Sequence, residues 1–352
     1  MDIARQRLRT QRLTGRGFAS AVDAVRWFGA VQAQDYAGAL WALGLRTAGA
    51  TEASVEQALF DRAIVRTWPL RGTLHFVAAT DVRWMMDVLG ARTIARNARR
   101  LQQFGLDERI FKRCTAVTIT SLEGGRQLSR PQLYARLEQA GIATGGMRGL
   151  HIVWKLAHDG LICFGARDGR QQTFALLEEW VPKAKTLDRD EALAELARRY
   201  FTSHAPATLQ DFTWWSGLPA GDARRAVEAA GASVAAAGTP HPAPRTRDAA
   251  ALRPPHPAPH LVLLPAYDEY TVAYLDRSAA LDPRHAAASR NGICPTIGID
   301  GRIAGTWTRT LTSAGVTIAL QPLIALKPAQ RRVLTAAAER YGRFLARPIR
   351  LV

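Results

Sequence analysis

Apolar and polar positions between residues 129 and 176 follow a pattern of two helices and a two-stranded hairpin. Ser129 can cap a helix in "RPQLYARLEQAG", with Pro131 in its first turn and Gly141 after its end. In "GGMRGLHIVWKLAHDG" the apolar residues recur at helical spacing, and "LICFGARDGRQQTFAL" has the pattern of strand, Gly-rich turn and strand. This order is typical of a winged helix, which is a helix-turn-helix followed by a β wing.

The same pattern predicts two further copies of the unit. Residues 21–77 contain helical patterns, one of them capped by Thr51, that lead into the strand, turn and strand of "AIVRTWPLRGTLHFV". A third copy begins in residues 190–231, where Thr208 can cap one helix and "PAGDARRAVEAAG" forms another. Residues 232–260 stand where its wing would follow, and their seven prolines predict a loop or linker.

The pattern changes after residue 260 and predicts a small element of mixed helix and strand. "HLVLLPAYDEY" begins as a buried strand, and "TIGIDGRIAGTW" places an Asp300-Gly301 turn between two alternating strands. "GVTIALQPLIAL" and "ARPIRLV" add strands around a helix at about 328–345. The predicted fold is mainly α with β, in three tandem winged-helix domains plus a C-terminal β-rich element. The expected segments are 1–80, 81–178, 179–260 and 261–352.

The charge balance points to an anionic partner. Lys and Arg number 47 against 30 acidic residues, which gives a net charge of +17 and predicts binding to nucleic acid or an anionic surface. Nearly all of this charge is arginine, which suits phosphate contacts, although high-GC coding would also replace Lys by Arg. The opening "MDIARQRLRTQRL" has no apolar signal region, and no run of 18 apolar residues follows, so we expect a soluble cytoplasmic protein.

Metal binding is not expected. The three cysteines lie far apart and form no CxxC pair, which is typical of a reducing cytoplasm without a zinc site. His241, His256 and His260 in the proline-rich segment lack the ordered spacing of metal ligands.

The basic residues concentrate in "VRWMMDVLGARTIARNARRLQQFG". At helical spacing one face would hold Arg92, Arg96, Arg99 and Arg100, and another would hold Ile94, Ala98 and Leu101. Acidic partners at i±4 are missing, and like charges this dense repel one another unless an anion neutralises them. We therefore predict a helix that follows DNA phosphates, with a plain solvated face as the alternative. A weaker run of arginines near the N-terminus could likewise bind phosphates or form a solvated face. Its members are Arg5, Arg7, Arg9, Arg12 and Arg16.

The stretch "GAVQAQDYAGALWALG" places two amides, Gln32 and Gln34, and the carboxylate of Asp35 among small and apolar residues. A glutamine amide cannot titrate; it can only orient other groups through its hydrogen bonds. Residues i and i+2 point the same way only in extended or irregular backbone, because in a helix they diverge by about 200°. We therefore expect the helix to end or distort between Gln32 and Asp35. Either the amides fix local backbone, or they hold something that the chain does not supply.

No Walker loop, GxSxG, HExxH or GxGxxG motif is present, and basic winged helices alone would indicate a transcription factor. However, "VQAQDYAG", "TWPLRGTLHF" about 35 residues later, and "LLPAYDEY" before the DG hairpin together resemble one family. It is the AlkZ-like DNA glycosylases of the azinomycin-resistance type, which are related to the YcaQ-type crosslink glycosylases. The resemblance covers nearly the whole chain. The Q-Φ-Q motif of the family falls on Gln32, Ala33 and Gln34, whereas the YcaQ-type branch has Asp in place of the second Gln.

The resemblance implies both a fold and an activity. The fold is three tandem winged helices in a C shape with a C-terminal β element. The activity is that of a monofunctional DNA glycosylase, which would hydrolyse the N-glycosidic bond of N7-alkylated purines and act on bulky adducts and interstrand crosslinks. Gln32 and Gln34 would be catalytic, and no lysine nucleophile is expected. We expect a monomer acting on double-stranded DNA at the nucleoid, without cofactor. The alternatives are a non-enzymatic winged-helix regulator and a family member that only binds DNA.

Further residues are assigned to the site by the same resemblance. Asp35, Arg71, His75 and Asp268 would line it. Asp35 could instead cap a helix, His75 could be a core histidine, and Asp268 could serve packing together with Tyr267 and Tyr270. Arg71 and His75 are placed at i and i+4 on one side of a wing strand. DNA contacts are expected from arginines around the C-terminal hairpin, Arg277, Arg302 and Arg309, whereas Trp307 between them could be a core residue.

Overall fold

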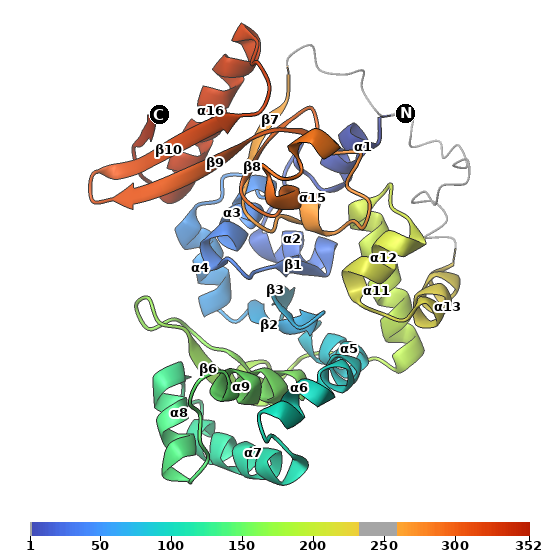
Figure 1. The fold of residues 1–352 in the computed structure, drawn as a ribbon, viewed down its shortest axis with the longest axis vertical. Helices are drawn as coiled ribbons and strands as arrows, with labels where there is room; N and C mark the ends of the chain where they lie inside the picture. Colours follow the sequence, from blue (N-terminus) through green and yellow to red (C-terminus); the bar gives the residue numbers. More distant parts are fainter. Residues whose placement is uncertain (1, 232–258) are drawn as a thin grey trace. The chain divides into compact units, whose positions relative to one another are not determined.

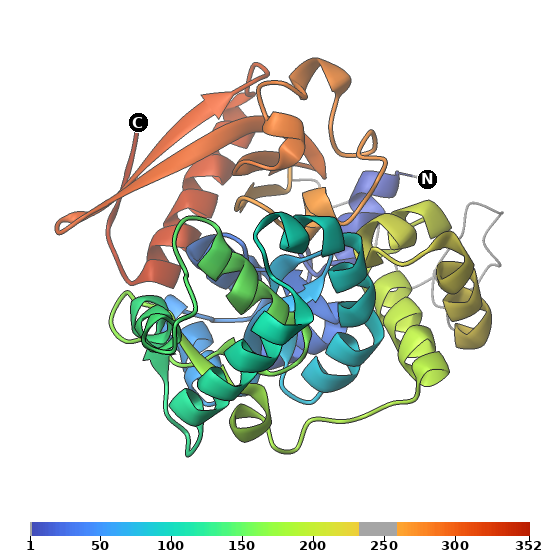
Figure 2. The ribbon, with the colours of Figure 1, turned by 60° about the horizontal axis from the view of Figure 1, so that its bottom comes forward.

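The computed structural model describes residues 2–231 and 259–352, which form two compact units. Unit 1 comprises Met1–Glu56 and Leu193–Val352, so it is built from both ends of the chain, whereas unit 2 is the continuous segment Gln57–Ala192. Figures 1 and 2 show the elements of each unit by colour along the chain. The expected mixture of helices and strands is confirmed. No helix among the described residues is long and apolar enough to cross a membrane.

Unit 2 contains the clearest of the predicted helix–helix–hairpin patterns. Its elements are β2 (Ile64–Leu70), β3 (Thr73–Ala78), α5 (Val82–Arg96), α6 (Ala98–Gln103), α7 (Glu108–Leu122), β4 (Leu128–Ser129), α8 (Arg130–Gln139), α9 (Arg148–His158), β5 (Ile162–Phe164), β6 (Thr173–Leu176) and α10 (Leu177–Trp180). A capping box of Ser129 and Gln132 starts α8, as expected. β6 pairs antiparallel with both β4 and β5, and β2 pairs antiparallel with β3.

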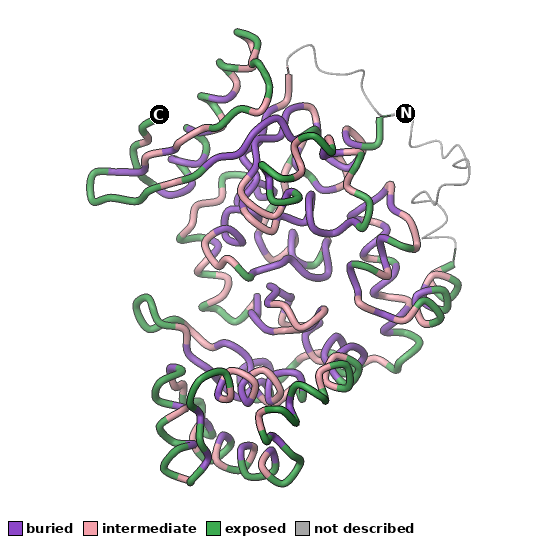
Figure 3. The backbone as a smooth tube through the Cα atoms, in the orientation of Figure 1, coloured by how far each residue is buried: buried purple, intermediate pink, exposed green. Residues whose placement is uncertain are grey.

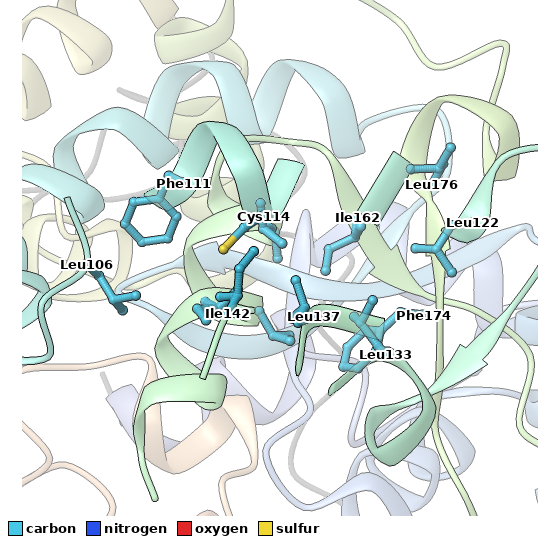
Figure 4. Close-up of a cluster of buried hydrophobic side chains, with 14 of the residues drawn as sticks. Leu106, Phe111, Cys114, Leu122, Leu133, Leu137, Ile142, Ile162, Phe174 and Leu176 are labelled. Carbon is cyan, nitrogen blue, oxygen red and sulfur yellow. The ribbon is translucent and has the colours of Figure 1, made fainter. Parts of the chain in front are cut away.

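The core of unit 2 forms where α7, α8 and α9 pack on the small sheet (Figure 4). Phe111 and Cys114 of α7, Leu133 and Leu137 of α8 and Phe174 of β6 are among its buried side chains. Burial raises the pKa of the Cys114 thiol to about 11, so this cysteine stays protonated and packs as a small apolar group.

Unit 1 holds the predicted C-terminal element together with helices from both ends of the chain. Its elements are α1 (Ile3–Thr10), α2 (Ala21–Phe28), β1 (Ala30–Gln32), α3 (Tyr36–Arg46), α12 (Leu209–Ser216), α13 (Ala220–Ala230), β7 (Leu261–Leu264), α15 (Glu269–Val272), β8 (Thr296–Ile299), β9 (Arg302–Thr312), β10 (Gly315–Pro322), α16 (Pro328–Leu345) and β11 (Ile349–Leu351). Two further helices, α4 (Glu52–Phe60) and α11 (Arg189–His204), include residues of both units.

The strands after residue 260 form one sheet of order β11-β10-β9-β8-β7. Neighbouring strands are antiparallel, except that β11 runs parallel to β10. Asp300 and Gly301 have φ values of 50° and 85°, which is the left-handed backbone that the predicted two-residue turn requires. Figure 3 shows β7 and β8 buried, whereas the far end of the β9–β10 hairpin is exposed.

Aromatic side chains join α3 to this sheet through α16. The Trp41 ring lies 4.9 Å from the ring of Tyr341 and 5.0 Å from that of Phe344. Trp41 Nε1 also donates to Leu263 O of β7 at 2.7 Å. Gly44 allows this approach, because a Cβ there would lie 2.5 Å from the Phe344 ring.

The linker expected at residues 232–260 lies almost entirely outside the described residues, and so do His241 and His256. His260 is described, and its backbone N–H donates to Asp300 Oδ1 at 3.2 Å. The described part of the chain contains no group of three or more His, Cys, Asp or Glu side chains placed to hold a metal.

Arg46, at the end of α3 in unit 1, is a buried charge that requires a counter-charge and several hydrogen-bond acceptors. Helix α3 is buried from Gly38 to Arg46, so this guanidinium has left water. It forms two hydrogen bonds with the Asp268 carboxylate, at 2.7 and 2.8 Å. Three more donors reach Gln11 O at 3.1 Å, Gln11 Oε1 at 2.9 Å and Ala42 O at 3.0 Å. All five N–H donors of the arginine are therefore used.

We predict that Asp268→Asn lowers the free energy of unfolding by about 3–5 kcal/mol, because it leaves a buried guanidinium without its counter-charge. Urea denaturation followed by circular dichroism measures the change. Arg284→Gln is the matched control, since it breaks an exposed pair with Asp282 in the same unit, and it should leave the midpoint unchanged. Equal midpoints for Asp268→Asn and the wild type would contradict the structural importance of this pair.

Candidate functional site

The two glutamines lie between α2 and α3, outside both helices. Helix α2 ends at Phe28, and Gly29 takes a φ of 80° that turns the chain into the short strand β1. Gln32 ends this strand, Gln34 lies in the following turn, and α3 begins at Tyr36. The helix was expected to end or distort between Gln32 and Asp35, whereas it already ends at Phe28, and the motif lies in the non-helical backbone that follows.

The backbone of Gln32 is held by a buried carboxylate. Its N–H donates to Glu269 Oε1 at 2.8 Å, and Glu269 is 1% exposed. The other oxygen, Oε2, accepts from Trp215 Nε1 at 3.0 Å, and His204 Nε2 lies 3.4 Å from it. Glu269 therefore joins β1 to α12 and to the end of α11.

The side-chain amide of Gln32 forms no hydrogen bond with any described residue, although the residue is only 8% exposed. Neither polar atom of this amide is completely buried, so both can still meet water or a ligand. The alternative in which this amide fixes local backbone is therefore not what the structure shows, because Glu269 fixes that backbone instead. Gln34 is exposed, so the motif combines one buried and one exposed glutamine.

Two consecutive acids anchor the two ends of the segment that contains the motif. Asp268 binds Arg46 at the C-terminal end of α3, and Glu269 binds Gln32 in β1. The preceding residue, Tyr267, has a φ of 60°, a left-handed conformation that is strained for a side chain of this size. Its N–H donates to Ile293 O at 3.0 Å. Asp268 was expected in the site, and the structure makes it a support for α3.

Sequence reasoning missed Glu269, Arg46, Trp215 and His204. The signal for Glu269 was its position beside Asp268 in "YDEY", directly after a buried strand. The signal for Arg46 was a charged residue ending the apolar run "ALWALGLR". Neither signal identifies the pairing of Glu269 with Gln32 or of Arg46 with Asp268, because each pair is separated by more than 200 residues in the chain.

A chain of hydrogen bonds joins the Arg46 anchor to His204. Gln11 accepts from Arg46 and donates from Nε2 to the Tyr274 hydroxyl at 3.0 Å. That hydroxyl donates to His204 O at 2.9 Å. Burial raises the pKa of Tyr274 well above its usual value, so the hydroxyl remains a donor. Arg7 stacks on the Tyr274 ring with its guanidinium carbon 3.5 Å from the ring centroid, and this arginine is therefore structural.

Asp35 occupies the N-cap position of α3, but its side chain makes no capping hydrogen bond, so the expected cap is absent. Its half-buried carboxylate lies over the first turn of the helix, where a Cβ on Gly38 would meet Asp35 Oδ2 at 2.6 Å. Among the described residues it has no hydrogen-bond partner.

Arg71 and His75 belong to unit 2. Arg71 is not on a strand beside His75, as the sequence suggested, because it lies in the β2–β3 turn with a φ of 53°, next to Gly72. His75 is fully buried in β3, and its Nδ1 lies 2.9 Å from Thr73 O. This position fits the alternative of a core histidine.

The basic helix is broken. Helix α5 ends at Arg96, Asn97 caps it by donating from Nδ2 to Thr93 O at 2.9 Å, and α6 begins at Ala98. The four arginines therefore do not lie on one face of a single continuous helix, as the spacing predicted. Ala98, which was expected on the apolar face, is exposed. All four arginines are nevertheless exposed: Arg92, Arg96, Arg99 and Arg100. Arg100 Nε donates to His151 Nε2 at 3.4 Å.

The arginines near the C-terminal hairpin differ in exposure. Arg302 at the start of β9 is exposed. Arg277 is half-buried and donates to Asn291 O at 2.5 Å, and burial lowers its pKa. Arg309 is half-buried and donates to the Tyr341 hydroxyl. Trp307 is 3% exposed, so it is the core residue that the alternative foresaw.

Comparisons of the sequence and of the fold with known proteins agree in finding similarity to DNA glycosylases. A family model described as DNA glycosylase AlkZ-like matches residues 25–344. The chain is 24% identical over 328 residues to a protein of Streptomyces sahachiroi named interstrand DNA cross-link repair glycosylase, and the match covers 86% of this chain and 85% of the relative. The solved structure of the Streptomyces sahachiroi DNA glycosylase AlkZ has a similar fold, with a TM-score of 0.76 at 23% identity over 100% of this chain and 98% of that one. Because the family model matches most of its length, the chain belongs to the AlkZ-like DNA glycosylase family.

Proposed function

We propose that the protein is a monofunctional DNA glycosylase that hydrolyses the N-glycosidic bond of N7-alkylated purines in double-stranded DNA. The observation that supports this most directly is the Gln32 amide, which has no described hydrogen-bond partner while Glu269 holds its backbone. An amide whose backbone is held while its own donors and acceptor are unused by the protein is suited to a reacting water or sugar.

Cleavage of the glycosidic bond does not require an acid that protonates the leaving purine. An N7-alkylated purine already carries a positive charge, so it leaves as a neutral base when the bond from C1′ to the purine nitrogen breaks. The sugar then becomes cationic at C1′, and a water adds its oxygen there and releases one proton. The amide carbonyls of Gln32 and Gln34 can stabilise the cationic sugar and orient that water. Asp35, whose carboxylate has no described partner, is available to accept the proton.

We extend the proposal to bulky adducts and interstrand crosslinks, because the Streptomyces sahachiroi relative is named for crosslink repair. A base bound to both strands cannot rotate freely into a closed pocket, as bases do in most glycosylases. Gln34 is exposed, which suits a motif that approaches DNA from an open surface.

Replacing either glutamine should reduce excision but not binding. We expect Gln32→Ala and Gln34→Ala each to slow release of 7-methylguanine from duplex DNA at least tenfold, since losing one preorganised polar group costs roughly 2.7–4 kcal/mol of barrier. Affinity should stay within about 1 kcal/mol, because no charge is removed. Single-turnover excision and fluorescence anisotropy measure the two effects. Gln139→Ala, at an exposed glutamine of α8, is the control. Wild-type excision by both site variants would refute the catalytic role.

The reaction should stop at an abasic site. A β-lyase step needs an amine that forms a Schiff base with the sugar, and the residues assigned to this site include no lysine. Incubation with lesion-containing DNA and sodium borohydride should therefore yield no covalent adduct on a denaturing gel, while alkali cleaves the product strand. A known bifunctional glycosylase on its own substrate checks the trapping. A trapped species would exclude the monofunctional mechanism.

The arginines around Asn97 should bind phosphates without regard to sequence. Arg96→Gln/Arg99→Gln removes two exposed charges, and Gln keeps a similar helix propensity. Each lost phosphate contact lowers the salt slope of log K by about 0.9, so we expect a decrease of up to about 1.8 for damaged and undamaged duplex alike. Anisotropy titrations between low and moderate salt measure it, with Arg109→Gln/Arg130→Gln in the same unit as the control. An unchanged slope would mean that this surface does not meet DNA.

A further inference from the structure

A pocket of about 620 Å³ lies within unit 1, at the C-terminal ends of α3 and α16. The loops 12–17 and 47–51 complete its wall. Trp41 and Phe344 contribute apolar surface to it, and both are buried side chains of the core. The pocket is distant from the glutamine motif, because Gln34 precedes the N-terminus of α3 and a helix of this length spans about 16 Å.

The charged side chains that line the pocket are all arginines: Arg12, Arg16, Arg340 and Arg343. No carboxylate lines it, and within the described chain none of these four arginines forms an ion pair. The nearest acids in sequence, Glu52 and Glu339, adjoin lining residues without lining the pocket themselves.

The guanidinium groups of the four arginines differ in the contacts that they make with the rest of the protein. One terminal nitrogen of Arg340, Nη2, donates to Leu45 O at 2.7 Å and to Gly44 O at 3.3 Å, so it caps the C-terminal end of α3. Arg12 lies over the rings of Phe18 and Trp27, at 5.6 and 5.3 Å from their centroids. These contacts hold two guanidinium groups in place at the pocket and leave most of their N–H donors unused.

The side chains of Arg16 and Arg343 are exposed and form no hydrogen bond or ion pair with described residues. Burial, and then the neighbouring charges of Arg343 and Arg46, lower the pKa of Arg340. Asp268 neutralises Arg46 but does not line the pocket, so no carboxylate of the lining offsets the repulsion among its arginines. An anion in the pocket would relieve that repulsion.

We propose that this pocket binds a phosphate group. Arginine presents paired donors that match two phosphate oxygens, and several converging guanidinium groups are typical of phosphate recognition. The volume admits either a phosphorylated small molecule or a phosphodiester of a DNA strand. Both supply the same chemistry, and the experiment below separates them. The inference does not depend on the proposed excision reaction, because its probes contain no lesion.

The test uses the full chain and two probes. Isothermal titration calorimetry measures binding of inorganic pyrophosphate, and fluorescence anisotropy measures binding of an undamaged duplex over a range of salt concentrations. Arg16→Gln/Arg343→Gln removes the two arginines of the lining whose side chains form no described hydrogen bond or ion pair. Arg224→Gln/Arg332→Gln is the matched control, since it removes two exposed arginines of unit 1 that do not line the pocket, one of them on α16. Circular dichroism verifies that both proteins are folded.

A free phosphorylated ligand is indicated if the wild type and the control bind pyrophosphate and the pocket variant binds it at least tenfold more weakly. A DNA phosphate is indicated if the salt slope of log K falls by up to about 1.8 in the pocket variant and stays unchanged in the control. Either result supports the proposal. It is overturned if the pocket variant and the control behave alike with both probes.

Discussion

The buried guanidinium of Arg46 is the constraint on which unit 1 depends. Moving such a charge out of water costs several kcal/mol, and the cost is offset only if the counter-charge and every hydrogen-bond acceptor are in place. Gln11 after α1, Ala42 in α3 and Asp268 before α15 supply them. These groups come from opposite ends of the chain. Arg46 is therefore satisfied only when the N-terminal helices and the C-terminal element have assembled around it.

This assembly also positions the glutamine motif. Asp268 and Glu269 are consecutive, so the fold that places the first carboxylate on Arg46 also places the second on the backbone of Gln32. Two acids thus hold both ends of the segment that contains Gln32 and Gln34. The catalytic role proposed for Gln32 and Gln34 depends on the position of neutral amides rather than on a tuned pKa, and such positioning needs a rigid support.

The arginines that give the chain its net charge have different roles. Arg7 and Arg46 are buried and hold the interior of unit 1 together, and Arg309 donates to a core tyrosine. Arg96 and Arg99 are exposed, with no ion pair among the described residues. Composition alone treats all of these arginines as equal contributors to an anion-binding surface. Burial shows that part of the charge stabilises the fold, and only the remainder is available to phosphates.

Local features of the sequence determined much of the fold. The capping box at Ser129, the Asp300-Gly301 turn and the bounds of α16 follow from interactions within a few residues. The two glutamines were recognised from the family motif, and their catalytic role stays a proposal. The tertiary structure alone decided the break of the basic helix at Asn97, the place of Arg71 in a turn, and the partners of Arg46 and Gln32. The carboxylates that bind Arg46 and Gln32 lie more than 200 residues away in the chain, and no local pattern records a contact at that distance, because burial and charge pairing choose partners only after the chain has folded.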